Sequence, residues 1–587
     1  MVMDHPTIHK STSFPVDPNL GDWANSRQGF DWASVEAEID FLPGGRADGR
    51  LNVAYEAIDR HVAKGNGAKV AMHWLGKNDE TESYTYDDMR RQTNKFAHVL
   101  EGLGVGSGKR VFTFMERLPE IYFTFFGALK ADCVIGPLFS AFGPDPVRDR
   151  MEASGATVLV TQPELRNKIA DILPQLPDLK YIIVVNKDGR SSAPLVEGDL
   201  SFETLMADAS DADVDIKTTR DSYSVMHFTS GTTGKPKGAV HRHNSVIQQY
   251  VTGKWCLDLH PDDVYWCTAD PGWVTGTSYG MIAPWTNGVT QIIYEGGFSA
   301  RKWYQVLQDY NVTVWYTAPT AIRMLMKSGV ELPKAFNTPN LRFIASVGEP
   351  LNPEGVMWGQ EVFGLPFHDN WWQTETGAIM IANYNSMAIK PGSMGRPIPG
   401  VEAGIIDADG NPVADGEGGI LAVRPGWPSM FQVYWNDQER YDSRFKNGWY
   451  LTGDEAVRDS EGYFWFVGRS DDVINTAGHL VGPFEVESAL IEHPAVAEAG
   501  VIGKPDPIAM EVVKAFVSLK EGYEASDELR RELMGFARKK LAAAVAPREI
   551  EIVDGLPKTR SGKIMRRLLK ARELGLPEGD TSTLEED

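Results

Sequence analysis

The chain has 587 residues, of which 42% are hydrophobic and 10% aromatic, so it is long enough for about two to four globular units. Its formal net charge of −22 argues against a nucleic-acid partner and against docking on anionic membranes, because both kinds of binding depend on Lys and Arg. An acidic protein that binds a polyphosphate must instead concentrate positive charge locally.

The three cysteines, Cys133, Cys256 and Cys267, are too few and too widely spaced for a disulfide framework or a zinc site. Because free thiols are usual in a reducing compartment, we expect a cytoplasmic protein. The segment 1–15 contains charges and no apolar run of signal-peptide length. The sequence has no window of about 18 apolar residues, so it predicts no helix that spans a membrane.

The predicted elements begin after a first segment of 50 residues without clear periodicity, which we expect to wrap the surface with Trp23 and Trp32 as anchors. Residues 85–103 predict an amphipathic helix, with Thr85 and Asp88 as a capping arrangement and Gly104 as a stop. Apolar runs that favour strands then alternate with helix-like stretches; they lie at 110–115, 157–161, 181–186, 224–228, 312–316 and 341–347. This alternation predicts an α/β architecture with largely parallel sheets.

After residue 400 the pattern changes to short alternating runs separated by turns such as 407–411 and 459–462, which predict an antiparallel or β-barrel-like unit. Helices are predicted at 483–493, 526–544 and, with basic residues, 563–573. We therefore predict a large N-terminal domain over 1–468, made of α/β sheets plus a β-barrel-like subdomain. A hinge at 469–471 and a small, mobile α+β C-terminal domain over 472–587 would follow.

The segment 228–240 combines hydroxyl side chains, glycines and lysines directly after a predicted strand. Glycine lets backbone N–H groups approach a ligand, and hydroxyl and ammonium groups add donors, so the segment predicts a phosphate-binding nest. It is not the common P-loop, because Thr229 and Pro236 stand where that pattern needs Gly and Ser or Thr. A flexible surface loop is the alternative. The predicted phosphate-binding residues are Thr229, Ser230, Gly231, Thr232, Thr233, Gly234, Lys235 and Lys237.

Four further segments, 369–377, 451–454, 468–472 and 556–567, gather polar side chains. Thr374 could donate to a phosphate, and Glu375 could hold Mg²⁺ through oxygen. A carboxylate such as Asp454 suits a ribose diol, and Arg469 could join it. Lys563 follows Ser-Gly at the start of a predicted helix and could project beyond the loop. Each segment taken alone also fits a polar turn, a surface ion pair or a solvated basic end.

Together and in this order, these blocks resemble the core motifs of the adenylate-forming acyl-CoA synthetase superfamily, over roughly residues 50–575. Within it the chain is most similar to the acetyl-CoA synthetase subgroup, on 266–275, 346–350, the pair Trp371 and Trp372, and 562–567. The resemblance implies an AMP-forming acetate–CoA ligase. A carboxylate attacks the α-phosphorus of ATP in the presence of Mg²⁺, which gives acyl-AMP and diphosphate, and the CoA thiol then displaces AMP.

The resemblance also implies roles for single residues. Lys563 would join the substrate carboxylate and the α-phosphate, Thr374 would touch the α-phosphate, and Glu375 would ligate Mg²⁺. Asp454 and Arg469 would bind the ribose. The other expected nucleotide-site residues, some of them lining the adenine, are Gly348, Glu349, Pro350, Asp369, Asn370, Trp371, Trp372 and Gln373.

An acyl pocket walled by Val274, Thr275 and Val347 would be closed by Trp372, which favours acetate first and propionate second. The resemblance places CoA contacts at Thr275, Ala477, Gly478 and Arg538, and a hinge at Asp471 that turns the C-terminal domain between the two half-reactions. It matches Ile491, His493 and Val496 to a structural cation site, although His493 equally fits a helix-end cap before Pro494. Lys563 is also the expected target of a lysine acetyltransferase and deacetylase.

The chain departs from the pattern at Leu480, where relatives usually have an Arg that contacts phosphate oxygens, and less seriously at Thr277 and Ala477. His479 or another Arg could substitute for the missing guanidinium. Three alternatives stay open: a propionyl- or medium-chain acyl-CoA synthetase on the same fold, an enzyme that loads a carrier protein, and a nucleotide sensor without catalysis.

Overall fold

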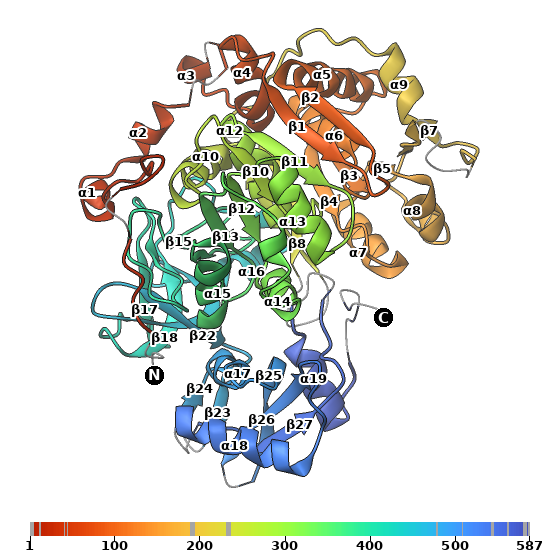
Figure 1. The fold of residues 1–587 in the computed structure, drawn as a ribbon. Coiled ribbons are helices and arrows are strands. Elements are labelled where there is room, and N and C mark those ends of the chain that lie inside the picture. The colour runs from red at the N-terminus through yellow and green to blue at the C-terminus, as the bar shows by residue number, and fades with distance from the viewer. Residues whose placement is uncertain are drawn as a thin grey trace.

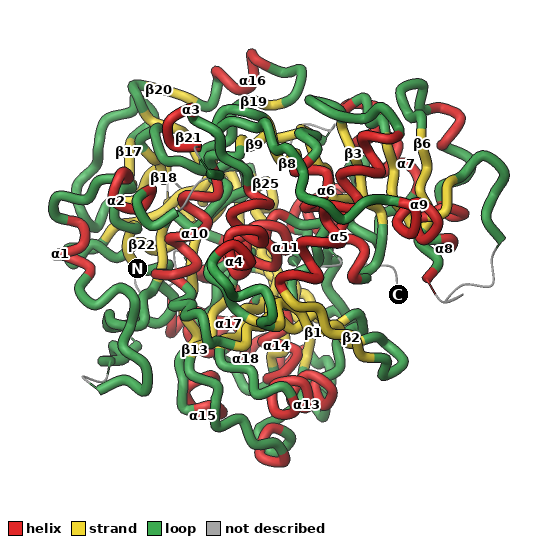
Figure 2. The backbone as a smooth tube through the Cα atoms, turned by 90° about the horizontal axis from the view of Figure 1, so that it is seen from above, coloured by secondary structure: helices red, strands yellow, loops and turns green. Residues whose placement is uncertain are grey.

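The computed structural model describes residues 5–584 except 11–12, 40–41, 44, 188–193, 230–235, 477–478, 508, 542–544, 560–562, 579–580 and 582–583. Figure 1 shows a large body of sheets and helices above a smaller C-terminal unit, drawn in blue. Figures 1 and 2 both place strands β17 (Ala403–Ile406) and β18 (Gly418–Val423) on the opposite side of the large body from β3 (Arg110–Phe114).

A nine-stranded sheet forms the centre of the large body. Its strands, in spatial order, are β16 (Arg396–Pro397), β15 (Ile381–Ala382), β14 (Phe367–Trp371), β13 (Phe343–Ser346), β12 (Val314–Thr317), β10 (Val264–Cys267), β11 (Thr290–Tyr294), β1 (Val70–Leu75) and β2 (Thr81–Thr85). The strands from β14 to β1 pair in parallel, and the edge pairs are antiparallel. The register places Ser346 of β13 beside Asp369 of β14.

An eight-stranded sheet lies beside it. In spatial order it contains β19 (Val433–Tyr434), β9 (Lys237–Arg242), β8 (Tyr223–Thr229), β4 (Val134–Leu138), β3, β5 (Val158–Thr161), β6 (Tyr181–Val184) and β7 (Leu200–Ser201). All pairs from β8 to β7 are parallel, whereas β8 and β9 form an antiparallel hairpin. Helices connect most parallel strands, as such crossovers require.

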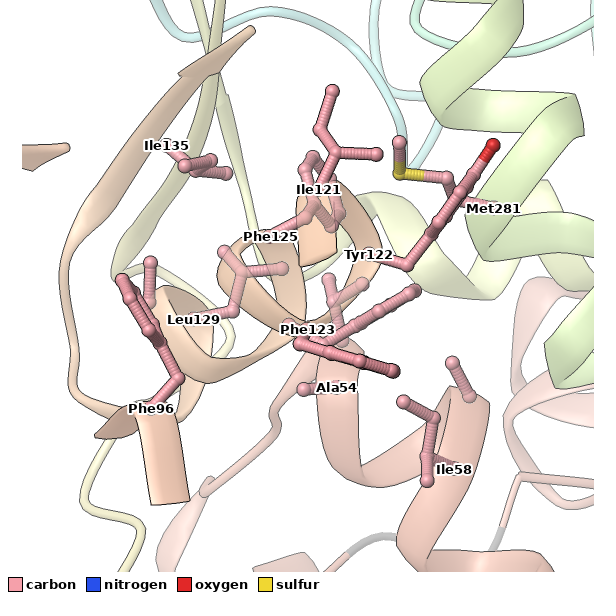
Figure 3. Close-up of a cluster of buried hydrophobic side chains, with 14 of the residues drawn as sticks. Ala54, Ile58, Phe96, Ile121, Tyr122, Phe123, Phe125, Leu129, Ile135 and Met281 are labelled. Carbon is pink, nitrogen blue, oxygen red and sulfur yellow. The ribbon is translucent and has the colours of Figure 1, made fainter. Parts of the chain in front are cut away.

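The core between these layers is built around α6 (Pro119–Lys130), whose residues are all buried. A helix that is apolar on every side must be covered on every side. Figure 3 shows Ile121, Phe123 and Phe125 of α6 among side chains from other elements. Next to α6, α5 (Tyr86–Gly102) begins with the predicted capping box of Thr85 and Asp88 and ends before Gly104, whose φ is +70°.

The other helices of the large body surround the sheets (Figure 1). They are α1 (Trp23–Arg27), α2 (Trp32–Glu36), α3 (Gly45–Asp48), η1 (Tyr55–Asp59), α4 (Arg60–Ala63), α7 (Pro144–Ser154), α8 (Pro163–Lys168), η2 (Leu173–Gln175), α9 (Phe202–Asp208), α10 (Ser245–Cys256), α11 (Val274–Thr277), η4 (Ser278–Ile282), α12 (Ala283–Thr286), α13 (Ala300–Asp309), α14 (Pro319–Lys327), η5 (Pro333–Ala335), α15 (Pro353–Phe363) and α16 (Gln438–Asp442). Trp23 of the N-terminal segment donates from Nε1 to the oxygen of Pro397 (2.8 Å), and Trp32 packs against two clusters of buried side chains, so both act as anchors.

A third sheet follows residue 400. It contains β17, β18, β21 (Trp449–Arg458) and β20 (Phe445–Lys446), with β22 (Phe464–Arg469) paired to β21, and every pair is antiparallel. The turn at 407–411 forms as expected, because the carboxylate of Asp407 accepts from the backbone N–H groups of Asp409 and Asn411. The predicted change to antiparallel structure is therefore confirmed.

The C-terminal unit has its own sheet of β24 (His479–Val481), β23 (Ile474–Thr476), β26 (Met510–Leu519), β25 (Val496–Asp506) and β27 (Glu549–Ile552). Its helices are α17 (Pro483–Ile491), α18 (Asp527–Leu541) and α19 (Arg566–Leu574). The predicted basic helix begins later than expected, at Arg566, so Lys563 lies in a loop. The reason is local: Lys558 bridges Ile564, and the N–H of Lys563 donates to Oγ1 of Thr559 (3.0 Å), which closes a hairpin.

The fold class is thus confirmed, with element ends shifted by a few residues, as for the strand predicted at 312–316 and found at 314–317. The domain boundaries stay a prediction; β22 ends at Arg469 and β23 begins at Ile474. All three cysteines are free thiols. Within the described ranges, no helix is long and apolar enough to cross a bilayer.

Candidate active site

The predicted site segments follow the ends of strands in two sheets. Segment 347–350 follows β13, segment 372–377 follows β14, and the glycine-rich loop follows β8. The carboxyl ends of parallel strands commonly line ligand sites. Because β13 and β14 are paired neighbours, two segments that are about 25 residues apart in the chain lie side by side.

The glycine-rich loop is anchored at both ends, where Thr229 of β8 pairs with Lys237 of β9. The predicted residues between them, Ser230, Gly231, Thr232, Thr233, Gly234 and Lys235, lie outside the described residues. Lys237 Nζ is 5.7 Å from the centre of the Tyr434 ring, and the Tyr434 hydroxyl donates to Oε1 of Glu375 (2.7 Å). The structure thus brings a phosphate-loop lysine close to the predicted magnesium ligand.

The pKa of Lys237 is lowered to about 8, first by burial and then by the positive charges of Arg440 and Arg444. Glu375 opposes this effect. The nearby positive charges disfavour the charged form of Lys237. A bound phosphate would offset this effect, because its negative charge favours the ammonium form.

The turn at 373–377 is fixed through its backbone. Four successive carbonyl oxygens accept hydrogen bonds from other elements: those of Thr374 from Nε2 of His241 (2.8 Å), Glu375 from the N–H of Phe431 (3.0 Å), Thr376 from Nε1 of Trp427 (3.0 Å) and Gly377 from Oγ of Ser278 (3.0 Å). Residues of β9, the 427–431 loop and η4 therefore hold the backbone of this turn in place. The side chains of Thr374 and Glu375 do not take part in this anchoring.

His241 is buried, and burial lowers its pKa. Its Nδ1 lies 3.1 Å from the oxygen of Ser429, so both ring nitrogens face carbonyl oxygens. A neutral imidazole has a single N–H. Since the contact to Thr374 is the shorter one, we assign the proton to Nε2.

Asp454 is buried at the centre of a second group. Its Oδ2 accepts from Nε1 of Trp371 (2.9 Å) and Nε2 of Gln373 (2.8 Å), and its Oδ1 faces Nη1 of Arg469 (2.9 Å). The pairing of β21 and β22 sets Asp454 opposite Arg469. The predicted ribose pair is therefore in direct contact, and it also joins the segment 371–373.

The turn at 348–350 depends on Gly348, whose φ of +101° suits only glycine well. Glu349 accepts at Oε1 from Oγ1 of Thr320 (2.5 Å) and Nη2 of Arg323 (2.7 Å). The buried carboxylate of Asp369 accepts from Oγ of Ser346 (2.6 Å), and burial raises its pKa to about 7.

Asp369 also accepts at Oδ2 from the N–H of Leu351 (3.2 Å), so it holds both ends of the 346–351 segment. Asn370 donates from Nδ2 to the oxygen of Ser346 (2.9 Å) and accepts from the Tyr316 hydroxyl (2.9 Å). Both side chains are committed to internal bonds. They shape the wall near Gly348, Glu349 and Pro350.

The predicted acyl-pocket residues come from three elements. Val347 is buried after β13, and Trp372 follows β14 and packs edge-on against Tyr279, with ring centres 5.1 Å apart. Tyr279 belongs to η4, which continues directly from α11, where Val274 and Thr275 lie. The indole of Trp372 is thus supported by a fully buried aromatic ring.

Thr277, one of the departures, lies in the same turn of α11. Its Oγ1 donates to the oxygen of Val274 (3.0 Å) and is 2.7 Å from Nε2 of His227. Since the hydroxyl proton goes to the carbonyl, Nε2 of His227 is the donor in the second contact. Thr277 therefore helps to fix the backbone of a predicted pocket wall.

Lys563 faces this site from the C-terminal unit. Its side chain is exposed to solvent, and charged groups of both units lie near enough to influence its pKa. Burial lowers its pKa, the positive charge of Arg469 adds to that effect, and Glu349 and Asp454 oppose it. Lys563 therefore lies within electrostatic range of the group around Asp454.

The two units also touch away from the site, where Nδ2 of Asn352 donates to Oγ of Ser488. Arg566, at the start of α19, binds both carboxylate oxygens of Glu487 (2.7 and 2.5 Å) and lies 4.0 Å from Asp472. These contacts hold the hairpin that carries Lys563 against α17.

Several predicted residues are not brought to this group. Ala477 and Gly478 lie outside the described residues, as do the side chains of His479 and Leu480. Arg538 is exposed on α18, and Asp471 is exposed beside Arg469, with 3.8 Å between Oδ1 and Nε.

The suggested cation site at Ile491, His493 and Val496 lies at the end of α17. Nδ1 of His493 accepts from the N–H of Ala495 (3.2 Å), and its Nε2 is 3.3 Å from Oε1 of Glu532. These contacts are those of a helix-end cap. The cation site at these residues stays a prediction.

Sequence reasoning missed Tyr434, Arg440 and Arg444, which lie near Glu375 and Lys237. The segment 433–445 contains no motif that singles them out. His241 could have been found, because it lies in the strand that directly follows the glycine-rich loop.

Two family models match the chain: one described as AMP-binding enzyme over residues 59–435, and one described as AMP-binding enzyme C-terminal domain over residues 485–563. Among curated relatives, an acetyl-coenzyme A synthetase of Bacillus subtilis (strain 168) is 51% identical over 573 residues, which cover 97% of this chain and 98% of the relative. Another of Methanothrix thermoacetophila is 40% identical over 561 residues, which cover 91% and 85%.

Solved structures are similar over almost the whole chain. An acyl-CoA synthetase of Brucella canis has a TM-score of 0.74 and 34% identity, and covers 95% of this chain and 99% of its own. An anthranilate CoA ligase in complex with anthranoyl-AMP has a TM-score of 0.83 and 29% identity, with 93% and 99% covered.

Proposed function

Because the chain belongs to the AMP-binding enzyme family, we propose that it is an AMP-forming acetate–CoA ligase, which converts acetate, ATP and CoA to acetyl-CoA, AMP and diphosphate. One observation carries the proposal: Lys237, Glu375, Asp454, Arg469 and Lys563, from three sheets and both units, converge on one site. Relatives that are named acetyl-coenzyme A synthetase align with nearly the full length of this chain, and they support the choice of acetate and CoA as substrates.

The first half-reaction joins two anions. An acetate oxygen attacks the α-phosphorus of ATP, the bond to the β-phosphate oxygen breaks, and diphosphate leaves. Such transfer is mostly positioning and charge neutralisation. Lys563 donates to the acetate and α-phosphate oxygens, and Thr374 donates to the α-phosphate. A lowered pKa is compatible with this role, because two anions at the ammonium group favour its charged form.

Asp454 accepts from the ribose hydroxyls while Arg469 holds its carboxylate in place. Glu375 fits Mg²⁺, because a carboxylate is a hard oxygen ligand and only its Oε1 receives the Tyr434 hydroxyl. Mg²⁺ there would neutralise charge on the ATP phosphates. The ligands at this position would be Glu375 and oxygens of ATP itself.

In the second half-reaction the CoA thiol attacks the acetyl carbon of acetyl-AMP, and AMP leaves as the better leaving group. The C-terminal unit turns at Asp471, which moves Lys563 away and brings the segment around Ala477 and Gly478 to the thiol path. Arg538 contacts a CoA phosphate. Acetylation of Lys563 would remove its charge and stop the first half-reaction; mass spectrometry of protein from the native host tests that modification.

The acid is small because Trp372 closes the pocket formed by Val274, Thr275 and Val347. The indole of Trp372 packs against Tyr279, which has no exposed surface. The indole therefore cannot move away on that side without disturbing the core. We expect acetate to be the best substrate and propionate the second. A pocket of this kind rejects extra methylenes mainly by steric clash.

Two assays on the purified chain test the proposal. Exchange of labelled diphosphate into ATP should depend on acetate and on Mg²⁺, and should stop when the metal is chelated. Acyl-CoA formation from acetate, propionate, butyrate and hexanoate should fall in that order. Absence of exchange with every small acid would refute the function, and a preference for hexanoate would refute the acid alone. Exchange without acyl-CoA formation would point to a carrier protein as acceptor.

A further inference from the structure

Arg444, between α16 and β20, lies beside the Thr452–Asp454 segment of β21. Its Nη2 donates to the oxygen of Thr452 (2.9 Å), and its guanidinium carbon is 5.6 Å from the centre of the Tyr450 ring. Its Nε has no exposed surface and no hydrogen-bond partner among the described residues. The side chain is therefore held in place by Thr452 and Tyr450.

Gly453 separates the guanidinium groups of Arg444 and Arg469. Its φ is +75°, and a Cβ built there would lie 3.3 Å from Nη2 of Arg469 and 3.7 Å from Nη1 and Nη2 of Arg444. Two guanidinium groups thus approach one backbone position. Arg469 is neutralised by Asp454, whereas Arg444 forms no ion pair with any carboxylate that the structure describes.

Further positive charge lies on the other side of Arg444. Lys237 is close enough for Arg440 and Arg444 to lower its pKa. The two carboxylates that oppose this effect are both engaged, Glu375 by the Tyr434 hydroxyl and Asp437 by the N–H of Arg440. Three cations therefore lie near two acids, in a protein whose net charge is −22. Such an arrangement is unfavourable when empty and favourable around a polyanion.

We propose that Arg444 binds non-bridging phosphate oxygens of a nucleoside polyphosphate, through the Nη donors that its contacts with Thr452 and Tyr450 leave free. A planar guanidinium suits phosphate because two of its N–H groups can donate in parallel. Arg444 lies between Asp454, assigned to the ribose, and Lys237 with Glu375, assigned to the β- and γ-phosphates. This order places its contact at the α- and β-phosphates.

The identity of the nucleotide as ATP rests on the proposed function, whereas the anion site rests on the geometry alone. Arg444 also provides a guanidinium that this chain lacks at position 480, where it has Leu instead of the expected Arg. A guanidinium at position 480 would belong to the C-terminal unit and move with it. One at position 444 directly precedes β20 of the third sheet, so it would hold the phosphates through both half-reactions.

Binding measurements by calorimetry, without acid or CoA, test the proposal. ATP and adenosine are titrated into the wild type, Arg444→Gln and Arg444→Lys. A lost charge-assisted hydrogen bond should weaken ATP binding by about 10- to 100-fold in Arg444→Gln and less in Arg444→Lys. Adenosine, which has no phosphate, should bind all three alike.

Arg424 provides a matched control. It stacks on the Trp449 ring of β21 (3.8 Å) and donates from Nη1 to the oxygen of Asn447 (3.1 Å), so it makes the same kinds of contact at the outer end of the sheet. Arg424→Gln should leave both affinities unchanged. Equal ATP affinity in Arg444→Gln and the wild type would overturn the proposal, as would equal loss of ATP and adenosine.

The same variants distinguish this proposal from the proposed function. ATP binding that depends on Arg444 in a protein without acetate-dependent exchange would refute the ligase and support the phosphate contact. Exchange by Arg444→Gln with an unchanged KM for ATP would refute the contact and leave the ligase intact. If Arg444→Gln melts at a lower temperature than the wild type, Arg444→Lys decides, since it keeps the charge and the stem of the side chain.

Discussion

Glu354 is predicted to make the contact between the two units sensitive to pH. It lies in the first turn of α15, close to His5 of the N-terminal segment (3.9 Å) and to Glu492 at the end of α17, which is paired with Lys540. Its carboxylate oxygens have no exposed surface and accept no hydrogen bond from a described residue. Burial raises the pKa of Glu354 to about 7, and the charge of Glu492 adds to this.

The direction of the effect follows from the raised pKa. A buried carboxyl whose pKa lies above its ordinary value of 4.5 favours its neutral form, so its contribution is complete below pH 4.5 and is lost as the pH rises through about 7. The raised pKa corresponds to a loss of stability, relative to low pH, of about 3 kcal/mol near pH 8 and about 1 kcal/mol near pH 5.5. The difference of about 2 kcal/mol, or about 25-fold, is the upper limit of the effect on the contact between the two units. Part of the burial of Glu354 comes from α15 itself and does not depend on that contact.

The assay is energy transfer between dyes at exposed positions of the two units, introduced as Lys334→Cys and Tyr523→Cys. In the wild type, the arrangement in which Glu354 of α15 lies beside Glu492 of α17 should lose population between about pH 5.5 and pH 8. Glu354→Gln, which cannot ionise, should keep this arrangement at both values. Glu361→Gln, an exposed position of the same helix, should behave like the wild type. Equal pH dependence with and without the Glu354 carboxyl would refute the reasoning.

Three further outcomes are expected. Lys563→Ala should abolish diphosphate exchange and largely spare thioester formation from supplied acetyl-AMP; equal loss of both would contradict the division of labour. Trp372→Gly should shift kcat/KM toward longer acids by about fourfold per methylene, because each buried methylene contributes about 0.8 kcal/mol; continued preference for acetate in the acyl-CoA panel would remove Trp372 from the pocket wall. His241→Phe keeps a ring but loses the donor to Thr374, so kcat for exchange should fall about tenfold with a smaller change in KM for ATP; an unchanged kcat would show that the turn holds without it.

The local part of the fold followed from neighbours in the sequence. The capping box of Thr85 and Asp88 and the turn that starts at Asp407 involve residues a few positions apart, so short-range chemistry defines them. The predicted start of α19 was wrong by three residues, because a bridge between Lys558 and Ile564 closes a hairpin there. Such a bridge is not visible in helical periodicity.

The candidate site was found from sequence only where its residues stand in contiguous motifs. Arg444 and Tyr434 come from a segment without a motif, and they reach the site because β19 and β21 join different sheets on either side of it. The hydrogen bond from His241 to Thr374 joins residues 133 positions apart. Contacts of this kind depend on strand order, which a single sequence does not reveal.

The sequence by itself determined the family and the α/β class, and it predicted which side chains contact a nucleotide, because glycine, hydroxyl and carboxylate groups in short segments have a restricted chemistry. The tertiary structure decided which of these side chains have their polar atoms free. Asp369 and Asn370 use theirs to tie neighbouring strands together, and an arginine outside every motif lies beside the ribose pair. The physical reason is that a polar atom buried in a folded chain needs a partner, and only the packing of distant strands settles which partner it finds.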